Sequence, residues 1–360
     1  CEINKIPDGW ESGWSDLRGG GQVVLNCVAG IEKDGVKYYL LNDGSAVVGE
    51  QDKKKISGKV VIAEEVEYEG KKYTVTKVGD NAFADCASLT EIEIPDSVTA
   101  IGTSAFSGCN LKSILIPKSV KSIEANAFAA CQELKTLEFE EESQLETFNP
   151  DVFSSVTYLQ YAKIPASVIS YLPNRWSLEK VTVINGDIAD YAFDKCKSLK
   201  EVELQKEVTS VSAKAFSYFE AIESVCIQEG AQNIASGVFK DYCKNITKAE
   251  IPTKAISLIP SDNLQSVVIN GGDSIDGRAF SGYYKLTRIE IPDSVGYMGY
   301  EVFKGCDNLT VYCEASSQPA GWSSNWNYYG APVVWGYNTV PSDAKFDYSG
   351  HNGIIHLTNY

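Results

Sequence analysis

Histidine and cysteine are the residue types that most often perform chemistry, and their positions in this chain restrict what that chemistry can be. The 360-residue sequence has two histidines, His351 and His356, both among the last ten residues. The rest of the chain therefore has no histidine for acid–base catalysis or a zinc site. Ten cysteines are present, and the closest two are seven residues apart. Without a C-x-x-C pair, zinc-ribbon and thioredoxin-like sites are excluded.

Carboxylate pairs two residues apart are the remaining candidates for catalysis. Glu91 and Glu93 form one pair, and Glu201 and Glu203 form another. Alternate residues of a strand share a face, so such a pair is compatible with glycosidase chemistry. A solvated, charged sheet face is the simpler interpretation, because no feature of the sequence around either pair indicates a pocket that excludes water. We therefore expect a protein that is not an enzyme, with no catalytic residue, no metal ligand and no cofactor.

Most cysteines occupy one place in a repeated sequence. Six of them follow a phenylalanine by three or four residues, as Cys86 follows Phe83 and Cys109 follows Phe106. A cysteine that recurs at one place in a repeat is typical of a small, buried apolar filler. We favour reduced thiols in a core, with disulfides as the alternative, since an even number of cysteines is typical of secreted disulfide-bonded proteins.

The phenylalanines recur at a fixed period. Phe83 and Phe106 are 23 residues apart, and Phe106 and Phe128 are 22 apart. A period in this range is the signature of a solenoid. Each phenylalanine unit is followed by a segment of the form L-x-x-I-x-I-P, whose alternating apolar positions predict a short strand. Eleven such segments begin at Leu89, Leu111, Leu134, Leu159, Leu178, Leu199, Ile222, Ile246, Leu264, Leu286 and Leu309.

These patterns predict an α/β or mainly-β solenoid with a parallel sheet along one face. One coil cannot bury its own apolar side, so successive coils must stack and share a continuous core. A second period of 87 residues separates Phe193 from Phe280 and Pro165 from Pro252. The chain is therefore a duplicated block of about four coils. Each block has one shortened coil without the phenylalanine motif, between Leu159 and Leu178 and between Ile246 and Leu264.

The unit that runs from Asn81 through Cys86, Leu89 and Ile94-Pro95 to Gly102 resembles the BspA-like class of leucine-rich repeat. The resemblance covers roughly residues 58–336. It implies a right-handed leucine-rich repeat coil, and a place among surface and secreted proteins of gut and oral bacteria.

Both ends of a solenoid expose apolar edges and require caps. We predict a tether at residues 1–20, an N-terminal β cap at residues 21–78, and the solenoid at residues 79–310. An aromatic C-terminal cap at residues 311–336 and a tail at residues 337–360 complete the chain. Within the N-terminal cap, the turn at Asn42-Asp43-Gly44 predicts a hairpin. Strands at residues 59–63 and 72–76 are predicted to flank a second turn at Glu69-Gly70.

The first residue, Cys1, indicates a lipid attachment site, because mature bacterial lipoproteins begin at an acylated cysteine. Alternatively, the numbering merely starts there. With the family resemblance, we expect an exported protein, placed at the cell surface or in the outer membrane as a lipoprotein, or secreted. We expect a monomer that touches a membrane only through such an anchor.

The net charge of −16 makes nucleic acid a poor partner. Outward strand positions instead predict a surface for protein–protein recognition, and leucine-rich repeats are used in that way. We expect adhesion to a host or matrix protein through this acidic face. The predicted residues are Glu93, Glu138, Tyr161, Lys163, Glu203, Glu250 and Glu290.

Aromatic residues near the C-terminus provide an alternative function. Trp322, Trp326 and Trp335 are predicted either to stack against sugars, as a glycan-binding surface module, or to form a buried lid on the last coil.

Overall fold

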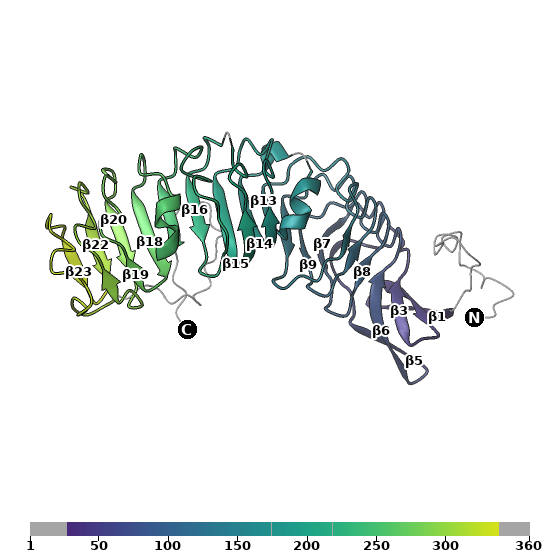
Figure 1. The fold of residues 1–360 in the computed structure, drawn as a ribbon. Helices are drawn as coiled ribbons and strands as arrows, with labels where there is room; N and C mark the ends of the chain where they lie inside the picture. The colour runs from purple at the N-terminus through teal and green to yellow at the C-terminus, as the bar shows by residue number, and fades with distance from the viewer. Residues whose placement is uncertain (1–26, 174, 218, 338–360) are drawn as a thin grey trace. The chain divides into compact units, whose positions relative to one another are not determined.

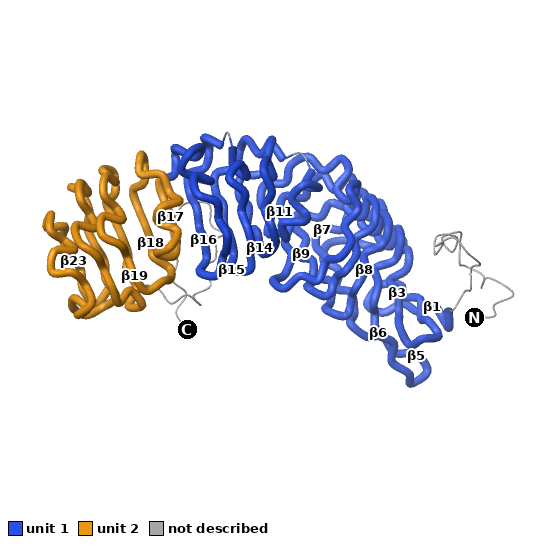
Figure 2. The backbone as a smooth tube through the Cα atoms, viewed as in Figure 1, with its two compact units in different colours: residues 1–246 blue, residues 247–360 orange. Residues whose placement is uncertain are grey.

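Short parallel strands, one in each coil, are the repeated element of the structure (Figure 1). The computed structural model describes residues 27–173, 175–217 and 219–337. Cys1, the tether and all of the tail but Tyr337 lie outside the described residues. The chain forms two compact units, unit 1 at residues 1–246 and unit 2 at residues 247–360 (Figure 2). Together they have about 11 turns, so the predicted mainly-β solenoid is confirmed, whereas the domain boundaries and the two caps stay predictions.

The sheet built from one strand of each coil has six parallel strands in unit 1, and β13, β14 and β15 lie side by side in Figure 1. In most of these strands buried and more exposed residues alternate, as in β9, where Ile114 and Ile116 are buried, whereas β14 has four consecutive buried residues at 181–184. This alternation follows from the strand period of two, which sends apolar residues into the coil. The strands are β9 (Ser113–Ile116), β11 (Thr136–Phe139), β13 (Tyr161–Ile164), β14 (Lys180–Ile188), β15 (Glu201–Val211) and β16 (Ser224–Ile227).

Unit 2 repeats this arrangement with five parallel strands. They are β17 (Lys248–Pro252), β18 (Ser266–Gly271), β20 (Arg288–Ile291), β22 (Thr310–Cys313) and β23 (Val333–Trp335). A two-stranded parallel sheet, β19 (Ser274–Ile275) with β21 (Tyr297–Met298), forms on another side of the coils. All eleven predicted strand starts are followed by a strand in one unit or the other.

A second sheet in unit 1 combines the N-terminal hairpin with short strands of the first coils. Its members are β1 (Cys27–Lys33), β2 (Val36–Leu41), β3 (Ser45–Val48), β5 (Glu65–Tyr68), β6 (Lys71–Val78), β8 (Ala100–Ile101), β10 (Ser122–Ile123) and β12 (Thr147–Phe148). The hairpin predicted at Asn42-Asp43-Gly44 is confirmed, because β2 and β3 pair antiparallel across that turn.

The strand predicted at residues 59–63 has a different partner from the expected one. It forms β4 (Gly58–Val61), which pairs in parallel with β7 (Leu89–Glu93), while β5 pairs with β6 across the turn at Glu69-Gly70. The prediction that the strands at residues 59–63 and 72–76 flank the turn at Glu69-Gly70 was therefore right for β6 and wrong for β4, because β5 lies on the other side of the turn. The physical reason is that Val60 and Ile62 are buried like the apolar residues of a coil strand, so β4 stacks on the first repeat.

The phenylalanines form a stacked column opposite the strands. Rings of Phe83 and Phe106 have centroids 5.3 Å apart at an interplanar angle of 3°, and Phe106 stacks on Phe128 at the same distance. In unit 2, Phe280 and Phe303 stack at 5.8 Å. Because each ring is buried between its neighbours, the period of 22 to 25 residues is the spacing that places one phenylalanine on the next.

The cysteines lie beside this column as reduced thiols. No cysteine of the described residues forms a disulfide, and all of them are buried except Cys226. The thiol of Cys131 donates a hydrogen bond to the carbonyl oxygen of Phe106 in the preceding coil, over 3.2 Å. Cys306 donates to Phe280 at the same distance in unit 2. Cys131 and Cys306 thus fill the core and also link neighbouring coils by a hydrogen bond.

The two shortened coils replace the phenylalanine turn with a 3-10 helix. The helices η2 (Ala166–Tyr171) and η4 (Thr253–Leu258) occupy positions 87 residues apart. Each begins after a proline, and Pro165 and Pro252 are its N-caps. Proline fixes φ and ends strand pairing, so it starts the helix directly after the strand. A third short segment, η3 (Arg175–Ser177), follows η2 in the same coil.

Candidate functional site

The outward positions of the parallel strands form continuous rows of side chains. In unit 1, Cα pairing places Glu138 beside Lys163, Lys163 beside Thr182, and Thr182 beside Glu203. A parallel row two residues earlier places Tyr161 beside Lys180. We call these two rows the strand face of unit 1. The full set is Leu115, Glu138, Lys163, Thr182, Glu203 and Cys226, with Ser113, Thr136, Tyr161, Lys180, Glu201 and Ser224.

The charges on this face are paired within the protein. Lys180 Nζ lies 3.4 Å from Glu201 Oε2, and Lys163 Nζ lies 3.2 Å from Glu141 Oε1. Both lysines are partly shielded from solvent, with side chains 31% and 23% exposed. Burial acts against the charge of Lys180, but Glu201 and Glu203 outweigh it and raise its pKa. Because cations and anions alternate, the face is less acidic than its carboxylates alone predict.

Hydrogen bonds hold the centre of the face in place. Thr182 Oγ1 donates to Glu203 Oε2 over 3.1 Å, and Gln228 Nε2 donates to Glu203 Oε1 over 3.3 Å. Burial raises the pKa of the Tyr161 hydroxyl. The Lys180 ammonium lies 5.9 Å from the centre of the Tyr161 ring. The side chains are thus oriented before any partner binds, which lowers the entropic cost of binding.

Glu93 lies outside the hydrogen-bonded sheet that carries this row. It belongs to β7, whose strand partner is β4, and it lies beside Val61. Lys59 forms ion pairs with both Glu93 and Glu91. One carboxylate pair considered for catalysis is thus held by a lysine. In the other pair, Glu201 forms an ion pair with Lys180, and Glu203 accepts hydrogen bonds from a hydroxyl and an amide.

The strand face of unit 2 carries the remaining predicted acidic residues. Cα pairing aligns Glu250 with Val268, and Val268 with Glu290. Beyond them, Tyr312 pairs with Glu290 and Val334 with Tyr312. The row therefore changes from acidic to apolar toward β23.

A cluster of side chains around Arg288 in unit 2 was not predicted from the sequence. The guanidinium of Arg288 lies 3.8 Å from the centre of the Tyr312 ring, and its Nε donates to Glu290 Oε1 over 2.9 Å. Its Nη2 donates to the Tyr337 hydroxyl over 2.8 Å. The available signal was position, because Arg288 stands two residues before Glu290 in an L-x-x-I-x-I strand and so faces outward with it.

The predicted tryptophan platform is mostly inside the protein. Trp322 and Trp326 are 5% and 4% exposed, and their rings pack edge-to-face with centroids 5.0 Å apart. Trp322 Nε1 donates to the carbonyl oxygen of Val295 over 2.8 Å. Trp335 packs against both and keeps intermediate exposure. The faces of the first two rings are therefore covered, whereas Tyr328 and Tyr329 beside them are exposed.

Within the part of the chain that the structure describes, no group of three or more His, Cys, Asp and Glu side chains is placed to hold a metal ion. Among the same residues, no helix has the length and apolar character needed to cross a bilayer.

Comparison with protein families matches the BspA type leucine rich repeat region, in six copies, to residues 70–180 and 174–262. No curated protein matches the chain. Among solved structures, a leucine rich cell surface protein from Faecalibacterium prausnitzii is 19% identical, covering 87% of this chain and 99% of its own, with a TM-score of 0.28. A leucine-rich repeat protein from Bacteroides ovatus is also 19% identical, with coverages of 85% and 99% and a TM-score of 0.27. The pneumococcal vaccine antigen PcpA is 12% identical, with coverages of 87% and 99% and a TM-score of 0.30.

Proposed function

The chain belongs to the BspA type leucine-rich repeat family, and from that premise we propose that it is a non-enzymatic cell-surface protein that binds an extracellular host or matrix protein. A protein-binding or adhesion role is the general expectation for this family of surface proteins. The proposal adds the location of the binding surface, which is the strand face.

One observation carries the proposal. Successive strands of unit 1 hold Glu138, Lys163 and Glu203 in continuous register, with the buried Thr182 between Lys163 and Glu203. A stacked backbone fixes their spacing at about 4.8 Å between strands, so a partner meets a preformed surface. Tyrosine is enriched at protein interfaces because it combines a large apolar ring with a polar tip, and Tyr161 supplies such a ring here.

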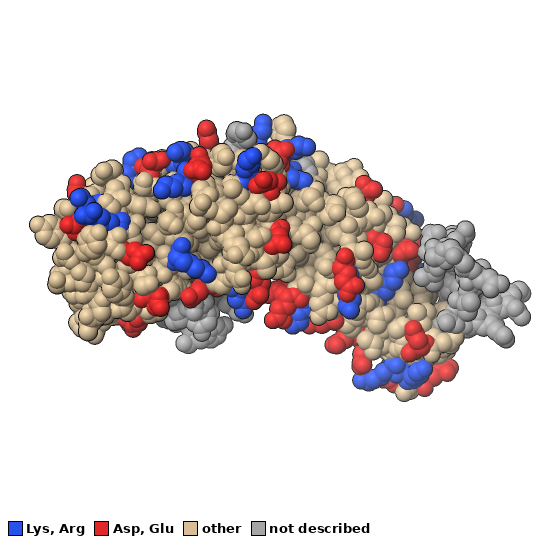
Figure 3. Space-filling view, in the orientation of Figure 1, with Lys and Arg blue, Asp and Glu red and all other residues tan. Residues whose placement is uncertain are grey.

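The paired charges also predict what kind of partner fits. Figure 3 shows lysine and arginine interspersed with aspartate and glutamate over unit 1. A partner with both signs of charge fits this surface better than a uniformly basic one, because a basic partner would compete with Lys163 and Lys180 for their carboxylates. The proposed binding residues in unit 1 are Glu138, Tyr161, Lys163 and Glu203; Glu93 of β7 and Glu250 and Glu290 of unit 2 are the further candidates.

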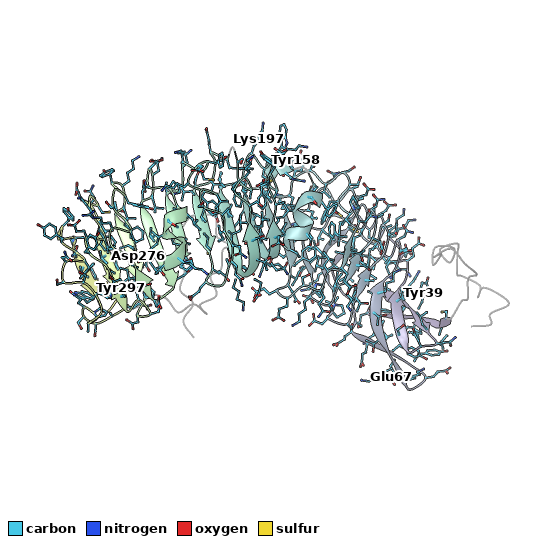
Figure 4. The ribbon with its side chains drawn as sticks, viewed as in Figure 1. Tyr39, Glu67, Tyr158, Lys197, Asp276 and Tyr297 are labelled. Atoms are coloured by element: carbon cyan, nitrogen blue, oxygen red, sulfur yellow. The ribbon has the colours of Figure 1, made fainter. Side chains whose placement is uncertain are left out.

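A matched pair of variants tests the proposal. Binding of the full chain to a panel of purified extracellular matrix proteins is measured by surface plasmon resonance. The variant Tyr161→Ala/Lys163→Ala removes a tyrosine and a lysine from the strand face, and Tyr158→Ala/Lys197→Ala removes the same residue types outside the strands of the same unit (Figure 4). We expect the first variant to weaken binding at least about tenfold and the second to leave it unchanged. Equal effects, or no binding to any member of the panel, would overturn the proposal.

A further inference from the structure

Exposed aromatic side chains gather in the last coils of unit 2, away from the strand face. Tyr300 and Tyr329 are each 49% exposed, and Tyr328 is 67% exposed. None of them belongs to a strand. A large aromatic side chain held in water does not stabilise the core, so exposed rings that cluster indicate a binding surface. We call Tyr300, Tyr328 and Tyr329, with the neighbouring Arg278 and Glu301, the tyrosine patch.

The turn that displays two of these rings is rigid. Asn327 Nδ2 donates to the carbonyl oxygen of Ala331 over 2.8 Å, and its Oδ1 accepts from the Ala331 N–H over 2.9 Å. Gly330 N–H donates to the carbonyl oxygen of Asn327, and Gly330 has a φ of +75°, which favours glycine. The turn is therefore closed by three hydrogen bonds, and Tyr328 and Tyr329 project from it with ring centroids 5.2 Å apart.

The third ring is fixed in a similar way by its surroundings. Tyr300 lies so close to Gly277 that a Cβ atom there would be 2.8 Å from the ring. The guanidinium of Arg278 lies 5.2 Å from the centre of the Tyr300 ring. The turn that carries Tyr329 is joined to the segment after Tyr300, since the Glu301 N–H donates to the carbonyl oxygen of Asn325 and the Val302 N–H donates to that of Trp326, each over 3.0 Å.

A charged pair with unused hydrogen-bonding capacity completes the patch. Arg278 Nε and Nη2 both donate to Glu301 Oε2, over 3.0 and 2.8 Å. A guanidinium has five N–H donors, so further donors remain, as does the Oε1 acceptor of Glu301. The two charges cancel, so the patch offers a planar donor and acceptor pair without a net charge.

We propose that the tyrosine patch binds a neutral polysaccharide. A sugar ring has apolar C–H faces that stack on tyrosine and hydroxyl edges that hydrogen-bond to a guanidinium or carboxylate. Tyr300 and the Tyr328–Tyr329 turn come from successive coils, so the patch extends over more than one coil. An anionic polymer fits poorly, because the whole chain carries a charge of −16.

A protein partner is less favoured at this patch. The aromatic hot spots of protein interfaces lie in well-packed pockets that exclude water, whereas these tyrosines project from a turn. Projecting rings suit a ligand that lies along them. The proposal stands independently of the strand face, and it differs from the tryptophan platform because it uses the exposed rings and leaves Trp322 and Trp326 in the core.

Affinity electrophoresis of the full chain in native gels tests the proposal, with mannan, arabinoxylan and mixed-linkage β-glucan as neutral probes and polygalacturonate as the anionic comparison. We expect at least one neutral probe to retard the protein, and polygalacturonate not to. Tyr328→Ala/Tyr329→Ala should reduce the association constant about tenfold or more, because two stacking surfaces are lost. Tyr158→Ala, which removes an exposed tyrosine of unit 1, should leave the association constant unchanged.

Conservative variants separate stacking from other causes. Tyr328→Phe/Tyr329→Phe keeps both rings and should retain most of the binding. Thermal unfolding of each variant checks that the exposed substitutions leave the fold intact. The proposal is overturned if no neutral probe retards the wild-type chain, if Tyr158→Ala weakens retention as much as the double alanine variant, or if the phenylalanine variant loses binding to the same degree.

Discussion

The thiol of Cys109 donates a hydrogen bond to the backbone carbonyl oxygen of Phe83 in the preceding coil, with a sulfur–oxygen distance of 3.1 Å. The two residues are neighbours in the core although 26 positions separate them in the chain. Cys131 repeats the contact with Phe106, and Cys306 repeats it with Phe280. Stacking of coils thus adds an inter-coil hydrogen bond to a carbonyl that already accepts a backbone N–H of its own turn, as Phe83 does from Cys86 over 3.1 Å.

These thiols predict a loss of stability in alkali. Burial raises the pKa of Cys131, Cys196 and Cys243 from 9.0 to about 12, and that of Cys86 to about 11. Between pH 9 and these values the unfolded chain releases thiol protons that the folded chain keeps. The contribution of these thiols to the free energy of unfolding is therefore fully present below about pH 9 and is lost as the pH rises toward 11–12. Each thiol reduces the free energy of unfolding by about 1.4 kcal/mol per pH unit in that range.

Urea unfolding at pH 8, 9 and 10 measures this slope, and Cys131→Ala provides the comparison. The variant should be less stable at pH 8 by roughly 1–2 kcal/mol, because a buried sulfur is lost. The free energy of unfolding of the variant should then fall less steeply with pH than that of the wild type, because one thiol fewer releases its proton on unfolding. A slope identical to that of the wild type would show that the Cys131 thiol does not titrate differently on unfolding.

The phenylalanine column predicts a large effect of truncation at its centre. Phe106 is fully buried between Phe83 and Phe128, so Phe106→Ala should reduce the free energy of unfolding by about 3–5 kcal/mol. Phe148 is the matched control, since it is only half-buried and lies beside the column, 5.8 Å from Phe153. Phe148→Ala should cost clearly less in urea unfolding. Equal losses would mean that stacking in the column adds nothing to stability.

Much of this fold is predictable because the same apolar positions recur in every coil and pack in the same way. Phe83, Phe106 and Phe128 stack because their spacing equals one coil, and the strand register follows from the same period. The duplicated block was also visible, since Pro165 and Pro252 are 87 residues apart.

Other parts depend on contacts that no local pattern specifies. A missing phenylalanine reveals a shortened coil but not the 3-10 helix that fills it at Ala166–Tyr171. Val60 and Ile62 alternate as a hairpin strand or a coil strand would, so only tertiary stacking assigns β4 to β7. For the candidate site, the row from Glu138 to Glu203 follows from the period. The pairing of Lys163 with Glu141 does not, because Glu141 lies outside the strands and reaches the row only through side-chain geometry.

Cys226 is predicted to be the reactive thiol of the strand face. It has intermediate exposure, whereas the other cysteines of the described residues are buried. Burial raises the pKa of the core thiols, so they stay protonated and inaccessible at neutral pH. A disulfide reagent added to the native chain at pH 8 should modify Cys226 well before the core thiols, which should react only in denaturant. Cys226→Ser is the control, and labelling of Cys131 or Cys243 in its native state at the same rate would contradict the prediction.

Left-handed residues on either side of the phenylalanine predict a stabilising substitution. Asn126 and Ala130 flank Phe128 with φ values of +57° and +55°. A residue with a Cβ atom pays roughly 1–2 kcal/mol in this conformation, while glycine does not. Glycine already occupies the position equivalent to Ala130 at Gly108 and Gly305.

Ala130 is exposed, so Ala130→Gly loses little packing and should raise the free energy of unfolding by about 0.5–1 kcal/mol. Ala125→Gly, at a residue of the same turn without a positive φ, should lower it by a similar amount. Urea unfolding of both variants tests this prediction. If the two substitutions change the free energy of unfolding in the same direction, backbone strain does not govern the stability of this turn.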